Sequence, residues 1–187
     1  MRILETERII LREILPEDAA FILDLLNQPS FIQYIGDRGV RTEEEAREFI
    51  ETRYRPSYSE HGFGLYLVEL KETQTPAGMC GFVKRDTLPE PDIGFAFLPQ
   101  YGKQGYAYES AAALMKYGRE VLRLGSILAI TTQDNESSGR LLGKIGFSFA
   151  RLIKMPHDDD ELKLFVSEAG PNVSSDNLGS DVNSLER

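Results

Sequence analysis

The chain has 187 residues, of which 41% are hydrophobic and 27% charged, and its formal net charge at pH 7 is -9. This composition is typical of a soluble globular protein, and no apolar run reaches the roughly 18 residues that suggest a membrane span. The acidic balance argues against a nucleic-acid partner, because a phosphate backbone is bound by a basic face. It weakly favours a cationic substrate, although we expect most of these charges simply to keep the surface solvated.

The reactive residue types are few. The N-terminal residues lack the long apolar stretch of a secretory signal, and the only cysteine, Cys80, cannot form an internal disulfide. Cys80 lies in an apolar run, so we expect a buried side chain rather than a nucleophile. The two histidines, His61 and His157, are too few and too far apart to suggest a metal site. We therefore expect a cytoplasmic protein without a metal.

The first half of the chain begins with a strand pattern at residues 8–12 and a helix pattern at residues 16–26. Thr42 and Glu45 form a capping box, which predicts a second helix from there to about Tyr54. Three strand-like runs follow, separated by turn residues. This spacing is typical of an antiparallel meander, with strands at residues 65–70, 79–84 and 93–98.

The second half changes to alternating strands and helices. A long helix is expected over residues 107–124, with Gly125 as its C-terminal glycine. Strand–helix–strand–helix–strand order implies crossovers on a mixed sheet. The later elements are expected at residues 127–130 (strand), 135–145 (helix), 147–153 (strand) and 162–166 (strand). We expect one domain over residues 1–167, followed by a polar, loosely packed tail at residues 168–187.

The turn before the long helix, residues 98–107, carries two glycines, Gly102 and Gly105. Glycines permit a tight turn, and the helix N-terminus adds about half a positive charge. Such a turn forms a pyrophosphate site, with Lys103 as an additional cation. A glycine pair before a helix is also a common simple turn. The spacing matches neither the GxxxxGK[ST] nor the GxGxxG pattern, so ATP and NAD are poorly supported.

Three segments, in this order, resemble GNAT acetyltransferases. Residues 5–12 are similar to the opening of the branch that contains the ribosomal-protein N-terminal acetyltransferases (RimJ/RimL-like). Residues 98–109 resemble the acetyl-CoA pyrophosphate loop, and residues 135–147 resemble the family's N-x-x-S-x-x-L-x-x-K-x-G-F segment. The resemblance covers about residues 5–166. It implies the GNAT fold, an α/β (α+β) architecture with a mixed, mostly antiparallel central sheet flanked by helices on both faces.

The chain departs from the family pattern at two places. The loop usually has a glycine at the position of Lys103, whereas here Gly102 lies one place earlier. With this shift the loop can still turn, but we expect one of its amides to point in a different direction. Gly139 and Gly143 lie inside a predicted helix, where each costs about 1 kcal/mol relative to alanine.

The resemblance implies a thioester site along residues 94–98 and a pyrophosphate site on the loop that follows. Tyr106 and Tyr108 flank this loop, where packing is their simplest role. Asn135 caps the next helix and also contacts the pantetheine arm. The implied acetyl-CoA contacts are Phe97, Leu98, Gly102, Lys103, Gln104, Gly105, Tyr106, Ala107, Asn135 and Ser138.

Two residues are the catalytic candidates that the resemblance implies. Asp92 begins the strand before the loop and is positioned to accept the amine proton; the alternative is a surface turn residue after Pro91. The hydroxyl of Ser138 is a candidate proton donor to the CoA sulfur, or else a small residue in a first helical turn.

The acceptor pocket of the family is usually built by the first two helices and their connection. Tyr34 and His61 are the main candidates here, and Phe31, Ile35 and Arg38 are neighbours of the same kind. The alternative to acceptor binding is that these residues pack in the core or face the solvent. The sequence does not identify the amine.

The implied activity is transfer of an acetyl group from acetyl-CoA to a primary amine, by direct attack in a ternary complex. The acceptor is a small molecule or a peptide, with no nucleic-acid or membrane partner, and the protein is a monomer or homodimer. One alternative is a non-catalytic acyl-CoA sensor, which binds CoA without turnover. Another is an interaction domain with an empty loop, which the shifted glycine favours.

Overall fold

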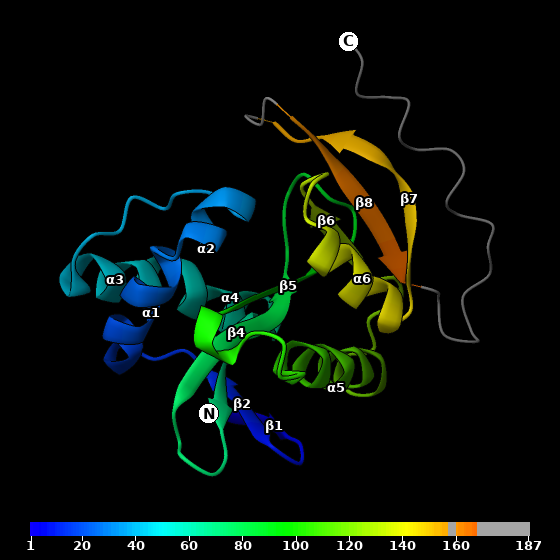
Figure 1. The fold of residues 1–187 in the computed structure, drawn as a ribbon. Coiled ribbons are helices and arrows are strands. Elements are labelled where there is room, and N and C mark those ends of the chain that lie inside the picture. Colours follow the sequence, from blue (N-terminus) through cyan, green and yellow to red (C-terminus); the bar gives the residue numbers. More distant parts are fainter. Residues whose placement is uncertain (157–159, 168–187) are drawn as a thin grey trace.

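The computed structural model describes residues 1–156 and 160–167. The predicted tail at residues 168–187 and His157 lie outside the described residues. The strands are β1 (Arg2–Glu5), β2 (Ile9–Glu13), β3 (Leu65–Leu70), β4 (Pro76–Val83), β5 (Asp92–Phe97), β6 (Leu128–Thr131), β7 (Phe147–Lys154) and β8 (Glu161–Ser167). Within the described residues they form one eight-stranded sheet in the order β1-β2-β3-β4-β5-β6-β8-β7 (Figure 1).

Six α-helices and three shorter helical segments connect these strands. The α-helices are α1 (Ala19–Leu26), α2 (Pro29–Tyr34), α3 (Glu43–Phe49), α4 (Arg55–His61), α5 (Tyr106–Glu120) and α6 (Glu136–Lys144). Two 3-10 turns cover Pro16–Asp18 and Pro99–Tyr101, and a π-helical segment covers Ile50–Tyr54. The counts refer to the part of the chain that the structure describes.

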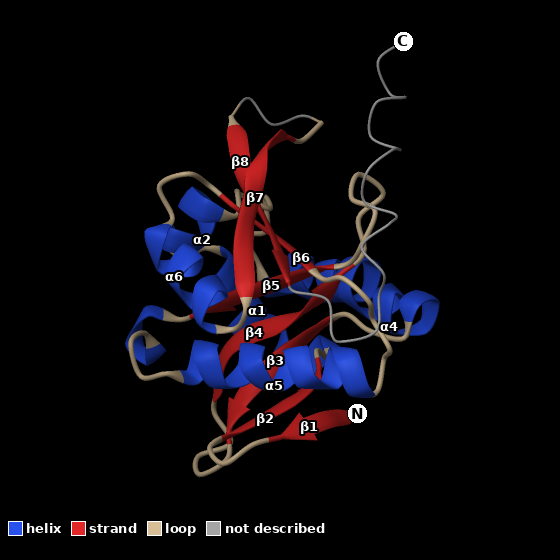
Figure 2. Ribbon diagram, turned by 90° about the vertical axis from the view of Figure 1, so that its right-hand side faces the viewer, coloured by secondary structure: helices blue, strands red, loops and turns tan. Residues whose placement is uncertain are grey.

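The sheet is mixed and mostly antiparallel, as predicted. Strands β1 to β5 pair antiparallel in chain order, which confirms the meander, and α5 makes the crossover to the parallel strand β6. Apolar side chains on the two faces of β4 form separate cores. Cys80 packs in the core that contains residues of α5, and Met79 packs in the core that contains residues of α1 and α3. Helices therefore cover both faces of the sheet (Figure 2).

The predicted capping box is confirmed at the start of α3. The Glu45 N–H donates to Thr42 Oγ1 at 3.2 Å, and the Thr42 N–H donates to Glu45 Oε2 at 3.1 Å. The prediction that this helix ends near Tyr54 is wrong, because helical structure continues through the π segment and α4 to His61. Pro56 explains the wide turn: its ring excludes the carbonyl of the residue four positions earlier, so an α-helix cannot pass it undistorted.

Two short elements are missing from the sequence prediction. Strand β1 has four residues, and α2 has six residues that were expected to belong to a connection. The prediction for the end of α5 is also wrong. The helix ends at Glu120, and Arg123, not Gly125, adopts the left-handed conformation with φ +57°. There the Leu124 N–H donates to the Gly118 carbonyl at 2.9 Å.

Candidate active site

Strands β5 and β6 meet only where both begin. Within the described chain they share one parallel ladder pair, Asp92 with Leu128. The Leu128 N–H donates to the Pro91 carbonyl at 2.9 Å, next to this pair. Beyond it the two strands diverge, and the sheet opens into a wedge with Asp92 at its closed end.

The rest of β5 presents unpaired backbone groups to this wedge. On its other edge, the Leu98 N–H donates to the Ala77 carbonyl of β4 at 3.0 Å. Successive residues of a strand direct their N–H groups to opposite edges. The amides of Phe95 and Phe97 therefore face the wedge, where they can donate to an extended ligand.

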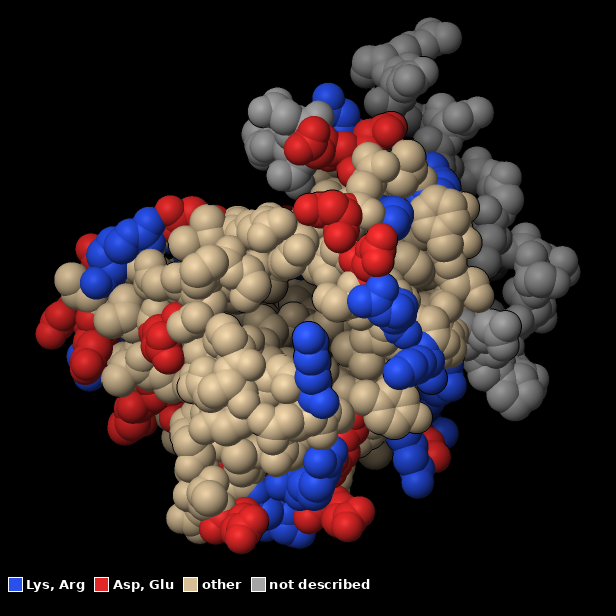
Figure 3. Space-filling model, viewed as in Figure 1, with Lys and Arg blue, Asp and Glu red and all other residues tan. Residues whose placement is uncertain are grey.

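A cavity of about 1240 Å³ occupies the wedge and extends to α2, the π segment and α4. Strands β5 and β6 and the first turn of α6 form the opposite walls. Figure 3 shows this face hollowed near its centre. The structure brings several predicted site residues into this one cavity: Tyr34, His61, Asp92, Phe97, Asn135 and Ser138.

Helix α5 begins without a side-chain cap among the described residues. Its N-cap, Gly105, has φ +86°, and the first helical bond runs from the Glu109 N–H to the Gly105 carbonyl at 2.9 Å. By contrast, Asn135 caps α6 as predicted, its Oδ1 accepting from the Ser138 N–H at 3.1 Å. The uncapped N–H groups of α5 are available to an anion.

Lys103 adopts the left-handed conformation that a glycine would favour, with φ +59°. Gly102, one place earlier, has an ordinary φ of -65°. The shifted glycine therefore does not prevent the turn, because the lysine makes it instead. A non-glycine residue in this conformation costs roughly 1–2 kcal/mol. Gln104 connects this turn to Gly105, and Tyr106 and Ala107 are the first two residues of α5.

Arg8 stabilises this loop through side-chain contacts that the sequence did not predict. Its Nη1 donates to the Gln104 carbonyl at 3.0 Å, and its Nε donates to Glu109 Oε2 at 2.7 Å. The guanidinium also lies 4.6 Å from the centre of the Tyr106 ring. Burial disfavours ionisation of Glu109, but hydrogen bonds from Thr6 and Arg8 outweigh it and hold the Glu109 pKa below its ordinary value.

Asp92 is buried, with 1% of its surface exposed, so the alternative of a surface turn residue is wrong. Arg85 Nε donates to its Oδ1 at 2.7 Å, and Arg85 Nη2 donates to its Oδ2 at 3.3 Å. Burial raises the Asp92 pKa above its ordinary value, and the Arg85 charge offsets only part of this rise. The result is a positioned carboxylate that gains a proton more readily than an exposed aspartate.

Polar groups gather where β6 ends and α6 begins. Ser138 is half-buried in the first turn of α6 and lines the cavity. Thr131, the last residue of β6, also lines it and is 8% exposed. Its buried hydroxyl has no hydrogen-bond partner among the residues that the structure describes. An unpaired buried hydroxyl is costly, so a ligand or a water in the cavity is needed to supply the missing partner.

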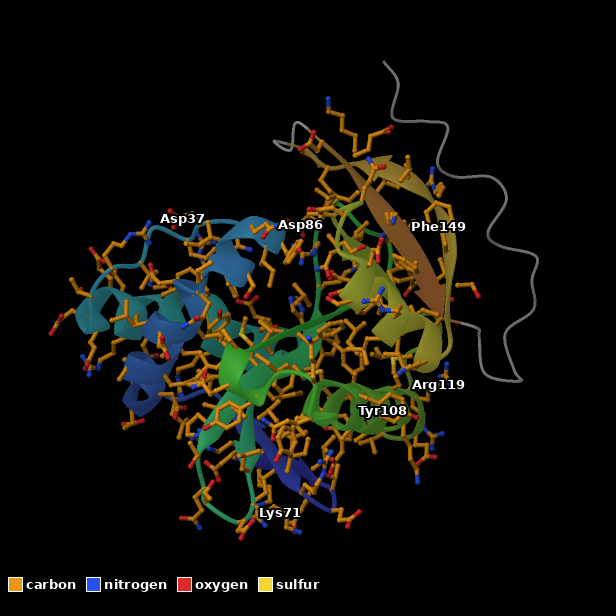
Figure 4. All side chains as sticks on the ribbon, viewed as in Figure 1. Asp37, Lys71, Asp86, Tyr108, Arg119 and Phe149 are labelled. Atoms are coloured by element: carbon orange, nitrogen blue, oxygen red, sulfur yellow. The ribbon has the colours of Figure 1, made fainter. Side chains whose placement is uncertain are left out.

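Some predicted residues lie apart from the cavity. Leu98 packs in the core beneath α1, its N–H is bonded to Ala77, and its carbonyl accepts from the Tyr101 N–H at 3.0 Å. Leu98 is therefore a packing residue rather than a direct ligand contact. Tyr108 projects from α5 and is 48% exposed (Figure 4). Cys80 is buried as expected, and burial raises the pKa of its thiol to about 12.

A family model described as acetyltransferase (GNAT) domain matches residues 8–148. The chain belongs to the GNAT acetyltransferase family. It is 32% identical to the uncharacterised N-acetyltransferase YoaA of Bacillus subtilis over 78% of this chain and 82% of that protein. A GNAT-family acetyltransferase structure from Bacillus anthracis is 27% identical and covers 89% of this chain and 97% of its own, with a TM-score of 0.72. RimL, a ribosomal L7/L12 α-N-protein acetyltransferase in complex with CoA, shares the fold at 17% identity, with a TM-score of 0.77 over 89% of this chain and 97% of its own.

This GNAT acetyltransferase takes its acetyl group from acetyl-CoA, and its residues fit that co-substrate. The open edge of β5 offers N–H donors at Phe95 and Phe97 to the amides and thioester of an extended arm. The uncapped start of α5 offers N–H groups to a phosphate. In the described part of the chain no group of three or more His, Cys, Asp or Glu side chains is placed to hold a metal. No described helix is long and apolar enough to cross a membrane.

Proposed function

We propose that the acceptor of this acetyltransferase is a primary amine, which attacks the thioester directly in a ternary complex. One observation carries the proposal: the open edge of β5, the buried Asp92 and the wall formed by α2 and α4 all line the same cavity. Both reactants therefore have room to meet beside a carboxylate. Holding them together supplies a large share of the rate.

Asp92 is the proposed general base. An amine must lose a proton as it attacks, and Asp92 is a carboxylate that lines the cavity near the closed end of the wedge. Arg85 fixes its orientation through two hydrogen bonds. Because burial raises the Asp92 pKa, its basicity is closer to that required at neutral pH than that of an exposed aspartate.

Negative charge develops on the thioester oxygen during attack and on the sulfur as it departs. We assign the backbone of β5 to the first and the hydroxyl of Ser138 to the second. The Phe97 N–H faces the wedge and is proposed to polarise the thioester carbonyl, whose oxygen becomes negative during attack. Ser138 is proposed to donate a proton to the departing sulfur. A covalent route through Cys80 is disfavoured, because that thiol is buried and its pKa is raised to about 12.

The test combines binding with turnover. Acetyl-CoA, desulfo-CoA and ATP at about 1 mM are compared for their effect on the melting temperature, and a panel of primary amines is then screened for CoA thiol release. Ligand at 100 times its Kd adds about 2.7 kcal/mol of stability. We expect both CoA compounds, but not ATP, to raise the melting temperature, and at least one amine to release CoA. Binding without release for any amine would favour the non-catalytic acyl-CoA sensor.

Arg8→Gln tests the brace of the pyrophosphate loop. The substitution removes the contacts to Gln104 and Glu109, so we expect KM for acetyl-CoA to rise about tenfold while kcat changes less than twofold. Steady-state kinetics with acetyl-CoA varied measures this. Arg2→Gln is the matched control, because the one ion pair of Arg2 among the described residues is with Glu5 on the same exposed strand β1. Equal KM values for Arg8→Gln and the unmutated enzyme would show that the loop keeps its binding conformation without the Arg8 contacts.

Thr131→Val tests whether the unpaired hydroxyl serves the ligand. Removing a buried unsatisfied group should leave the free protein at least as stable, whereas acetyl-CoA should bind about 2- to 10-fold more weakly because one hydrogen bond is lost. Calorimetric titration and thermal melting measure the two effects. Thr75→Val, in the β3–β4 turn outside the cavity, is the control. Unchanged affinity would show that the hydroxyl has no ligand partner.

A further inference from the structure

The π segment and α4, residues 50–61, form the wall of the cavity where we expect the acceptor, and we call this the acceptor wall. Contacts near its two ends show how it is placed along β4 and β5. At one end Tyr54 contacts Met79, its hydroxyl 3.8 Å from the sulfur, and Met79 pairs with Ala96. At the other end the His61 ring lies 5.9 Å from Phe63. Phe63 packs edge-on against Phe82, which pairs with the residue after Asp92. Phe63 and Phe82 pack on the face of β4 opposite to Tyr54 and Met79, so these contacts fix only the position along the strands. Tyr54 lies level with Ala96, and His61 lies nearer the level of Asp92.

Basic side chains lie at the Tyr54 end of this wall. Arg53 precedes Tyr54 on the π segment, and Arg38 comes from the loop between α2 and α3; both line the cavity. Burial raises the Tyr54 pKa, and the charge of Arg38 opposes that rise. Within residues 1–156 and 160–167, no carboxylate forms an ion pair with Arg38 or Arg53.

The other Lys and Arg side chains that line the cavity, Arg85 and Lys84, make close polar contacts within the protein. Arg85 is paired with Asp92, and Lys84 Nζ donates to the Leu88 and Pro89 carbonyls at 3.3 and 2.8 Å. The acidic lining residue of the same helical wall, Glu60, adjoins His61. Glu60 is seven positions after Arg53, which is about 10 Å along a helix. The wall is thus positive at one end and negative at the other.

We propose that the acceptor amine also carries an oxyanion, a carboxylate or a phosphate, which Arg38 and Arg53 bind. The inference rests on the proposed function and adds the substrate class. A planar guanidinium matches either oxyanion through paired hydrogen bonds. An acceptor whose amine reaches Asp92 from that end has several bonds between the amine and the oxyanion. Arg38 Nη2 donates to the Ile35 carbonyl at 3.5 Å, but neither Arg38 nor Arg53 pairs with a carboxylate among the described residues. The chain's net charge of -9 suggests a cationic acceptor, and these two arginines oppose one.

The experiment compares matched acceptors that differ only in the anion. Triglycine is compared with triglycinamide, O-phosphoethanolamine with ethanolamine, and spermidine serves as the cationic probe. We expect kcat/KM, from CoA thiol release, to be at least tenfold higher for the oxyanion member of a pair. The triglycine pair reports a carboxylate, and the phosphoethanolamine pair reports a phosphate. A preference for the amide, for ethanolamine or for spermidine would overturn the inference.

A double variant tests the assigned residues. Arg38→Gln with Arg53→Gln should remove the preference within a pair while the KM for acetyl-CoA changes less than twofold. Arg41→Gln with Arg55→Gln is the matched control, because Arg41 pairs with Asp37, which Figure 4 labels, and Arg55 pairs with Glu51. An intact preference in the first double variant would contradict the assignment.

A readout without turnover separates this inference from the proposed function. The melting temperature of the CoA complex is measured with triglycine and with triglycinamide. A larger shift with triglycine that the Arg38/Arg53 double variant abolishes would support oxyanion binding even if no amine released CoA, a result that would contradict only the proposed amine transfer. Turnover of every probe without preference, together with equal melting shifts, would overturn the oxyanion site and leave the proposed function standing.

Discussion

Gly105→Glu is expected to lower the affinity for CoA by at least 100-fold, about 2.8 kcal/mol at 1.4 kcal/mol for each factor of ten. The position is the N-cap of α5, where uncapped N–H groups and the helix dipole favour an anion. A glutamate places bulk and negative charge at this point. A Cβ atom there would lie 3.2 Å from Arg8 Nη2, so the new side chain would also disturb the brace.

Gly146→Glu is the control that separates lost binding from lost folding. Gly146 also has a left-handed backbone, with φ +90°, but a Cβ atom there meets nothing within 4 Å. It follows α6 at the end opposite to Asn135, away from the cavity. Both variants should lose a similar amount of melting temperature, whereas titration calorimetry should show lost CoA binding only for Gly105→Glu. CoA affinity within threefold of the unmutated enzyme would contradict the assignment of the loop.

Asp92→Asn is expected to lower kcat by about 10²- to 10⁴-fold, the usual contribution of a general base. The asparagine keeps the size of the side chain and can still accept from Arg85, which is 36% exposed and can be solvated if it loses the ion pair. The KM for acetyl-CoA should therefore stay within twofold. Ser138→Ala is a useful comparison, because it removes a proposed proton donor and leaves the base intact.

The pH dependence carries the sharper test of Asp92. The base must be ionised, so kcat/KM should fall as pH decreases through the folded-state pKa of Asp92. Burial raises that pKa, which moves this acidic limb above the range of an exposed aspartate. Arg85 partly offsets the rise, so Arg85→Gln should move the limb to still higher pH, and Asp92→Asn should remove it. A limb that stays in place in both variants would mean that another base or bulk water takes the proton.

Local signals explain what the sequence predicted well. The Thr42–Glu45 capping box and the Asn135 cap each depend on residues three positions apart, and both are present. Residues 65–70 form β3 as predicted, because turn residues bracket an apolar run. Strand β1 and helix α2 were missed since each is too short to show a full period.

Long-range contacts explain what the sequence could not predict. The burial of Asp92 depends on its pairing with Leu128 and on Arg85, and nothing in its local surroundings shows this. The partnership of Arg8 with Glu109 joins residues 101 positions apart. Both residues lie in segments that resemble the GNAT family, but the resemblance alone did not link them. Leu98 shows the converse, because a residue inside the loop motif proves to be part of the core.

The single ladder pair between β5 and β6 also has a mechanical consequence. Strands β1 to β5 form one half-sheet and β6 to β8 the other, and the backbone bonds that join the halves lie at one point, beside Asp92. A ligand that bonds to the open edge of β5 and to the groups around β6 acts as the missing strand between them. Acetyl-CoA is then a structural element of the enzyme as well as a reactant. It adds a backbone link between two half-sheets that otherwise share an apolar core, in which Phe82 and Phe165 both pack.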